Sequence, residues 1–190
     1  LTPQQRSELI LGQLATYSSR DLLLEPGTSQ QVAFNWLIND DAEQVCPEDF
    51  LNVQQRYILA VLYYGTNGDE WKQCNAATSS PVNPCPPGEQ FLAPTDVCTW
   101  FGISCNRNRV TGISIDENNL DGALPDELGY MEQLEDIDFD GELEEGLNVL
   151  VGTIPTTFGL LEKLSTLDLD SNELTGPIPE ALFDATRITI

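Results

Sequence analysis

The C-terminal part of the chain contains a unit that occurs three times, and this repetition restricts the chain to few folds. The three copies read "NNLDGALPDELGYMEQLEDIDF", "NVLVGTIPTTFGLLEKLSTLDL" and "NELTGPIPEALFDATRITI". They align on Gly122, Gly152 and Gly176 and on Pro125, Pro155 and Pro179, with spacings of 30 and 24 residues. One such unit cannot bury its apolar residues alone, so the repetition predicts layers that stack on one another.

Before the asparagine that opens each copy, alternating apolar residues predict a short strand. The equivalent pairs are Ile113/Ile115, Ile137/Phe139 and Leu167/Leu169, and each pair is followed by Asn118, Asn148 or Asn172. A period of two places the apolar side chains in the core, and successive layers then pair as parallel strands. We expect each asparagine to satisfy backbone groups at the next turn, where no strand partner exists.

The segment "DIDFDG" at 136–141 matches the first half of an EF-hand calcium loop. Such a loop needs a bidentate acid at its twelfth position, but residue 147 is leucine. The strand interpretation is therefore favoured, and it turns Asp136, Asp138 and Asp140 outward.

Outward positions carry acids in all three copies, so we expect an acidic surface on the concave side of the stacked strands. Its predicted members are Asp116, Glu117, Asp136, Asp138, Asp140, Asp168 and Asp170. Layers about 4.8 Å apart would stack these carboxylates in columns whose like charges repel. Three interpretations stay open: a solvated surface, a binding face for a basic protein or polyamine, and weak binding of divalent cations without any other cofactor.

The spacing from the first to the second copy is six residues longer than the spacing from the second to the third, and the segment that follows Phe139 reads "DGELEEGLN". Insertions in repeat proteins map to loops, often on the ligand side, so Glu142 and Glu144 are candidate partner contacts. A neutral loop insertion is the alternative, because surface loops tolerate length changes at little cost.

The charge of the chain excludes several classes of function. The net charge is −23, and residues 111–190 hold 19 acids and two bases, which argues against nucleic acid or an anionic membrane as partner. There is no histidine, so Ser-His-Asp and Cys-His catalysis and imidazole zinc sites are excluded. No apolar run is long enough to span a bilayer, and membrane attachment would need an anchor outside this sequence.

Five cysteines indicate disulfides and hence an oxidising compartment. Cys98 and Cys105 belong to the segment "CTWFGISC", which has the pattern C-x-W-x-G-[IV]-x-C. Cys74 and Cys85 flank a loop rich in Pro, Ser and Asn and are candidates for a second bridge, which would leave Cys46. Spacing alone does not settle how Cys46, Cys74 and Cys85 pair.

The repeat pattern L-x-x-L-x-L-x-x-N-x-L-x-G-x-I-P resembles that of plant-type leucine-rich repeat proteins. The segment "CTWFGISC" resembles the N-terminal cap of this family, which implies a disulfide between Cys98 and Cys105. Together with "AFNWLIND" and "QRYILAVLYYGTNGDEW", it resembles the extracellular leucine-rich repeat proteins of diatoms and related algae. This resemblance extends over nearly the whole chain.

We therefore predict an α/β solenoid, a short leucine-rich repeat array with a helical, disulfide-bonded N-terminal cap. Residues 1–73 form a helical region, 74–110 the disulfide-bonded loop and cap, and 111–190 about three repeats, the last incomplete. One helix is expected to begin at Thr2 and Pro3, and another at Thr28 or Ser29. A third contains the apolar stretch 57–64 and ends at the Gly65–Gly68 turn.

The resemblance implies a non-enzymatic, secreted or lumenal recognition module that binds a protein partner through the acidic concave face. The alternative is a structural subunit of a cell-surface or multiprotein assembly. Because no polar capping repeat follows Pro179, we expect either that the native chain continues or that this edge docks on a partner or another copy. A carboxylate-based hydrolase is disfavoured, since the acids recur in the repeat register and no single pair stands out.

Overall fold

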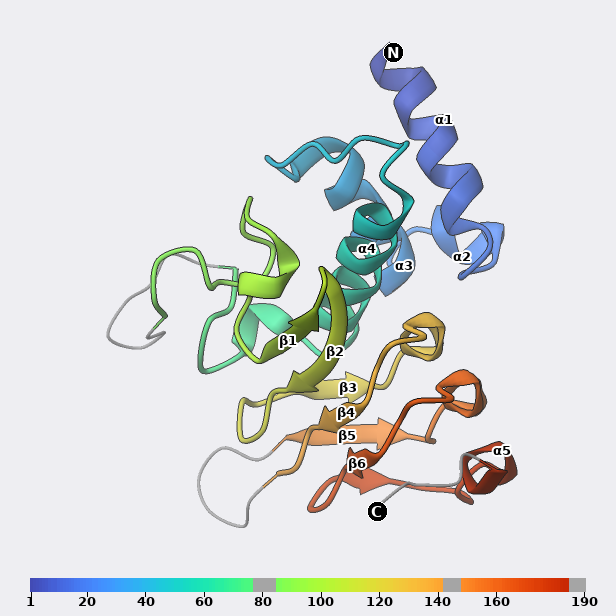
Figure 1. The fold of residues 1–190 in the computed structure, drawn as a ribbon, viewed down its shortest axis with the longest axis vertical. Helices are drawn as coiled ribbons and strands as arrows, with labels where there is room; N and C mark the ends of the chain where they lie inside the picture. The colour runs from blue at the N-terminus through green and yellow to red at the C-terminus, as the bar shows by residue number, and fades with distance from the viewer. Residues whose placement is uncertain (77–84, 142–147, 185–190) are drawn as a thin grey trace.

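Helices occupy the N-terminal end of the molecule and the strands of the repeats stack beneath them (Figure 1). The computed structural model describes residues 1–76, 85–141 and 148–184. The N-terminal helices are α1 (Pro3–Leu14), α2 (Arg20–Leu24), α3 (Ser29–Asn35), the π-helical turn η1 (Trp36–Asp40) and α4 (Phe50–Gly65). Short 3-10 turns follow at η2 (Gly68–Glu70), η3 (Val97–Thr99), η4 (Asp126–Tyr130) and η5 (Thr156–Leu160), and the last helix is α5 (Glu180–Asp184).

The helices begin at residues that cap free backbone N–H groups. The side chain of Thr2 accepts a hydrogen bond from the Gln5 backbone, and the Gln5 side chain accepts one from the Thr2 backbone, which forms a capping box at α1. Thr28 accepts from the Gln31 backbone at the start of α3. Both starts agree with the sequence prediction. The prediction missed α2, although Ser19 caps it by accepting from the Leu22 backbone.

Helix α4 lies at the centre of the N-terminal region and carries a buried ion pair. The guanidinium of Arg56 pairs with the carboxylate of Asp41 at 2.6 Å, and both side chains are fully buried. It also donates to the carbonyls of Thr95 and Ala93, and it lies over the rings of Trp36 and Trp100 at 5.4 and 5.0 Å. The guanidinium of Arg56 therefore holds together segments of the chain that lie between residues 36 and 100.

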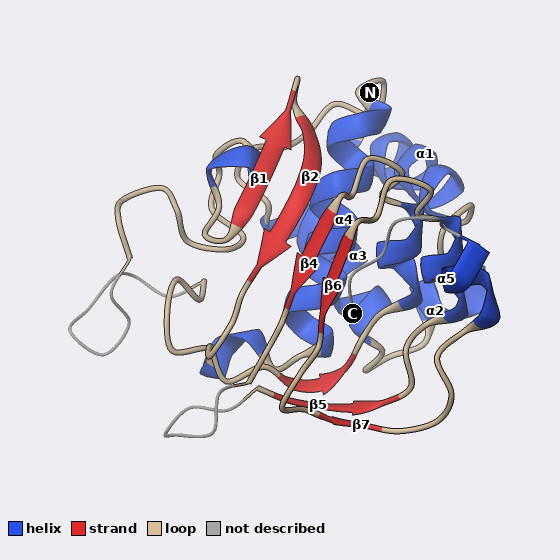
Figure 2. Ribbon diagram, turned by 60° about the horizontal axis from the view of Figure 1, so that its bottom comes forward, coloured by secondary structure: helices blue, strands red, loops and turns tan. Residues whose placement is uncertain are grey.

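The strands of the repeats form a four-stranded sheet in the order β1-β2-β4-β6 (Figure 2). These are β1 (Ile103–Asn106), β2 (Arg109–Ser114), β4 (Asp136–Asp138) and β6 (Thr166–Asp168). The last three pair in parallel, with Ile113, Ile137 and Leu167 side by side, as the repeat alignment predicts. The antiparallel strand β1 was not predicted, because it lies outside the repeating pattern.

A second parallel sheet contains β3 (Asp121–Ala123), β5 (Val149–Gly152) and β7 (Glu173–Leu174). These strands were not predicted from the sequence. Asp121–Ala123 pairs with Val149–Val151, and Val151–Gly152 pairs with Glu173–Leu174. Gly122 within β3 and Gly152 at the end of β5 have positive φ, 143° and 84°, which glycine adopts without strain.

Asn148 connects two layers through its buried side chain, which is 1% exposed. Its amide oxygen accepts from the backbone N–H groups of Asn118 and Leu120 at 3.1 and 2.9 Å. Its amide nitrogen donates to the carbonyls of Ile115 and Asp140 at 3.0 and 2.8 Å. Asn172 repeats this role in the next layer, where it accepts from the Leu150 backbone at 2.9 Å. Backbone groups at the turn are thus satisfied without a strand partner.

The structure contains the disulfide Cys98–Cys105 that the family resemblance implies, and it pairs Cys74 with Cys85, which the sequence left open. Cys46 is an exposed thiol that donates to the Glu48 carboxylate at 2.7 Å. Buried apolar side chains form one connected core that reaches from Ile10 to Leu182. The division into regions 1–73, 74–110 and 111–190 stays a prediction. Among the described residues, no helix is both long and apolar enough to pass through a bilayer.

We predict that Asn148→Ala lowers the free energy of unfolding by about 3 kcal/mol or more, because buried backbone groups lose their partners. Urea denaturation monitored by circular dichroism measures this loss. The matched variant Asn172→Ala should lose only about 1 kcal/mol, since Asn172 is partly exposed and water can replace its amide. Equal losses for the two variants would show that burial does not govern the role of these asparagines.

We predict that Gly122→Ala destabilises the chain more than Gly152→Ala does. Both glycines have positive φ, so each substitution costs about 1–2 kcal/mol of backbone strain. A Cβ at Gly122 would also collide with the Gly65 carbonyl at the end of α4, whereas a Cβ at Gly152 meets nothing closer than 3.8 Å. Thermal unfolding of the two variants measures the difference, and equal melting temperatures would contradict close packing of α4 on β3.

Candidate functional site

Acidic side chains lie on the outer face of β4 and β6 and just beyond the ends of the strands, opposite the buried Ile137 and Leu167. We call this surface the acidic sheet face, and its residues are Asp116, Asp136, Asp138, Asp140, Asp168 and Asp170. The parallel register sets Ser114, Asp138 and Asp168 next to one another on successive strands (Figure 2). The period-2 alternation of the strands therefore determines which side chains meet.

The closest group on this face contains Asp138, Asp140 and Asp168, whose carboxylates each place an oxygen within 4.8 Å of the others. Asp138 and Asp140 are partly buried and Asp168 is exposed. Ser114 Oγ donates to Asp138 Oδ2 at 3.2 Å, and the Asp170 backbone donates to Asp168 Oδ1 at 3.1 Å. These hydrogen bonds orient the two carboxylates toward the same side of the sheet.

The environment of Asp138 disfavours its charged form. Burial raises the pKa of the Asp138 carboxyl above its usual value, and the nearby charges of Asp116 and Asp168 raise this pKa as well. Hydrogen bonds from the Asp140 backbone and the Ser114 hydroxyl act in the opposite direction. Ionised Asp138 thus carries a repulsive cost that a cation or a basic partner would remove.

Carboxylate oxygens are the ligands that divalent cations such as Ca²⁺ prefer. Asp138, Asp140 and Asp168 offer three of them. Exposed acids also gather without a metal, however, so their proximity alone does not assign a metal centre. Weak binding of divalent cations stays a prediction.

The remaining predicted contacts are less closely grouped. Asp116 lies just beyond β2, and Glu117 follows it in a left-handed turn with φ of 50°, off the strand register. Asp136 lies opposite Gly112 and Thr166, away from the three grouped carboxylates. Glu142 and Glu144 lie outside the described residues.

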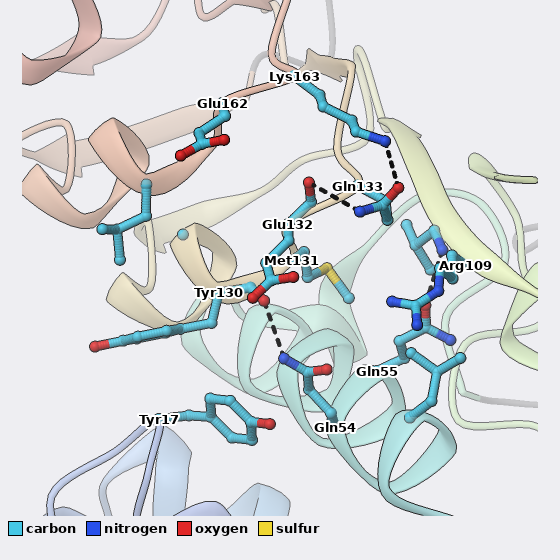
Figure 3. Close-up of a pocket in the computed structure, with 14 residues that line it drawn as sticks. Tyr17, Gln54, Gln55, Arg109, Tyr130, Met131, Glu132, Gln133, Glu162 and Lys163 are labelled. Atoms are coloured by element: carbon cyan, nitrogen blue, oxygen red, sulfur yellow. Dashed lines mark hydrogen bonds between the residues drawn. The ribbon is translucent and has the colours of Figure 1, made fainter. Parts of the chain in front are cut away.

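The sequence analysis missed a cavity of about 530 Å³ beside the sheet, which we call the flank pocket. It lies between α4 and the turns that precede β4 and β6, and the residues that line it include Tyr17, Arg109, Tyr130, Glu132, Leu160 and Lys163 (Figure 3). A signal was available: Arg109, Gln133 and Lys163 each precede the first apolar residue of a repeat. The contribution of α4 and of Tyr17 follows only from the tertiary structure.

A family model described as Leucine Rich Repeat matches residues 163–185. Leucine-rich repeat protein 1 of Arabidopsis thaliana is 49% identical over 39 residues, which cover 20% of this chain and 18% of that protein. Receptor-like kinase TMK4 of the same plant is 33% identical over 52 residues, which cover 27% of this chain and 6% of that protein. The chain thus spans less than a fifth of the length of either relative.

Among solved structures, the BIR3–SERK2 complex from Arabidopsis thaliana is similar, with 29% identity and a TM-score of 0.44. The match covers 50% of this chain and 51% of that one. The family model and the two sequence relatives identify leucine-rich repeats in this chain and plant leucine-rich repeat proteins as relatives of the matched segments.

We predict that Asp138→Asn raises the free energy of unfolding at neutral pH by about 0.5 kcal/mol, the size of one cross-strand pair. The pKa of Asp138 is higher in the folded than in the unfolded state, so the folded state binds the proton more tightly. Stability therefore falls as the pH rises through the interval between these two pKa values. Urea titrations at several pH values should show that the gain disappears below about pH 4, where the acid is protonated in both states.

The control is Asp136→Asn, because Asp136 faces Gly112 and Thr166 and not another acid. Its effect should be smaller. A gain of equal size in both variants at all pH values would show that Asp138 carries no special repulsion.

Proposed function

We propose that this chain is a non-enzymatic, extracellular module that binds a basic partner protein through the acidic sheet face. The observation that carries the proposal is the grouping of Asp138, Asp140 and Asp168 within 4.8 Å on a rigid parallel sheet. Repulsion between these carboxylates raises the free energy of the unbound surface. A cationic side chain that binds there removes this repulsion, which favours binding.

The charge balance of the repeats supports a partner of opposite sign. Residues 111–190 contain 19 acids and only two bases, so the protein itself supplies little counter-charge. A face of one sign steers cationic partners toward it and repels anionic ones. The attraction weakens as salt screens the charges.

The comparisons support a recognition role over an enzymatic one. TMK4 is a receptor-like kinase by name, and the alignment falls on its leucine-rich repeat part and not on its kinase part. The resemblance to extracellular leucine-rich repeat proteins of algae favours the same role. The fold alone does not identify a partner, whereas the acidic sheet face indicates the charge of one.

The two disulfides support an extracellular or lumenal location. Cys74–Cys85 and Cys98–Cys105 both close loops of the region between the helices and the repeats. Such bonds form and persist in oxidising compartments.

The test is binding of the chain to extracellular proteins of its source organism, compared with the double variant Asp138→Asn, Asp168→Asn. A partner that uses this face should bind the variant about tenfold more weakly, and its affinity for the unaltered chain should fall steeply as salt is raised. Surface plasmon resonance on each captured partner measures both effects.

The matched control is Glu8→Gln, Glu43→Gln, which removes two exposed acids outside the sheet. This control should keep full affinity. If both double variants lose affinity equally, the binding reflects total charge and the proposal fails. It also fails if the variant in the sheet keeps full affinity for every partner.

A further inference from the structure

The flank pocket has the features of a second binding site, separate from the acidic sheet face. Its volume of about 530 Å³ falls within the usual range for ligand sites, about 300–1,000 Å³. Its walls come from five parts of the chain: the turn after α1, helix α4, strand β2 and the turns before β4 and β6. The pocket therefore exists only when the helices pack against the repeats.

One wall is a column set by the repeat register. Arg109, Gln133 and Lys163 occupy equivalent positions in successive layers, and Lys163 Nζ donates to Gln133 Oε1 at 2.6 Å. Figure 3 shows these three side chains along one side of the pocket. Because parallel strands lie about 4.8 Å apart, the two cations are held at the ends of a short basic column.

The basic column lacks acidic partners within the described structure, where the observed ion pair joins Arg56 to Asp41. Lys163 donates instead to the neutral amide of Gln133. The guanidinium of Arg109 is exposed, and no described residue accepts a hydrogen bond from it. In a chain of net charge −23, two such cations at one pocket offer a local attraction for a carboxylate.

The other side of the pocket is aromatic and apolar. The rings of Tyr17 and Tyr130 lie 5.6 Å apart at 59°, and Figure 3 shows both across from Arg109. Leu160, which takes the position of Tyr130 in the next repeat, is 52% exposed at the rim. Exposed apolar and aromatic side chains beside a charged rim are typical of protein contact surfaces.

The backing of the pocket is held in place by hydrogen bonds. Gln54 Nε2 donates to the Tyr130 carbonyl at 2.9 Å, which ties α4 to the turn before β4. Gln55 accepts from the Val110 backbone at 2.8 Å and donates to the Asn108 carbonyl at 3.0 Å. A site whose walls are already ordered loses little conformational entropy on binding.

Two acidic side chains also line the pocket, so the pocket carries charges of both signs. Glu132 and Glu162 are equivalent in successive repeats, and each directly precedes a residue of the basic column. Both are exposed lining residues. The pocket thus presents a basic column, an acidic pair and an aromatic patch within one cavity.

We propose that the flank pocket binds a short peptide segment of a partner protein that carries an acidic, an aromatic and a basic side chain. The acidic group binds Arg109 and Lys163, the aromatic ring packs on Tyr17, Tyr130 and Leu160, and the basic group binds Glu132 and Glu162. A neutral sugar would use neither set of charges, so charge complementarity favours a peptide. This contact goes beyond the proposed function, because it uses a different face and a partner segment of mixed charge.

The test titrates the ¹⁵N-labelled, disulfide-bonded full chain with the peptide acetyl-Asp-Phe-Lys-amide and follows backbone amide signals by NMR. We expect chemical-shift changes at pocket residues such as Gln54, Met131 and Lys163. The neutral peptide acetyl-Asn-Phe-Gln-amide should bind about tenfold more weakly, as should the double variant Arg109→Glu, Lys163→Glu. Both substituted side chains are exposed, and a thermal melt verifies that the variant is folded.

Two controls separate this site from the acidic sheet face. Arg20→Glu, Lys72→Glu changes the charge equally at exposed residues outside the pocket and should keep peptide binding. Asp138→Asn, Asp168→Asn should also keep it, even if that variant loses the partner of the acidic sheet face.

Three results would overturn the proposal. The first is the absence of shift changes at pocket residues with the charged peptide. The second is a set of shift changes on the acidic sheet face that persists in Arg109→Glu, Lys163→Glu. The third is binding of the neutral sugar cellotriose at the pocket where the peptide fails, which would assign the pocket to carbohydrate.

Discussion

The hydrogen bonds of Asn148 hold the repeat layers in register, and both surfaces of interest depend on that register. The side chain binds backbone groups of Asn118, Leu120, Ile115 and Asp140, so it joins two layers at the point where strand pairing stops. A slip of one residue would turn every outward side chain into the core. The same bonds that stabilise the turn therefore also keep the acids outside and close together.

A second constraint comes from the buried Arg56, which joins the helical region to the disulfide-bonded region. Its contacts with Asp41, Trp36 and Trp100 cross segments that are distant in sequence. Removing either charge of this pair would leave the other buried and unpaired, which is costly. Helix α4 is thereby held at the first repeat, where its Gln54 and Gln55 back the flank pocket.

The two surfaces differ in their electrostatic character, and the difference suggests a division of roles. The acidic sheet face has one sign of charge and favours approach of a basic partner from a distance. The flank pocket has both signs and an aromatic patch, which suits the recognition of a particular short segment. One partner that used both surfaces would bind more tightly than a partner that used either surface alone, because the second contact would form at high effective concentration.

The repeat pattern determined much of this protein from sequence: the parallel strands, the inward apolar pairs, the asparagine positions and the outward acids. These features are local and periodic, and a period of two or of one repeat can be read along the chain. The second sheet, the strand β1 and the flank pocket were decided by tertiary structure, because they depend on turn geometry and on α4 packing beside residues more than 50 positions away. Sequence placed Arg109 and Lys163 in one column, but only the packing of the helices made that column the wall of a cavity.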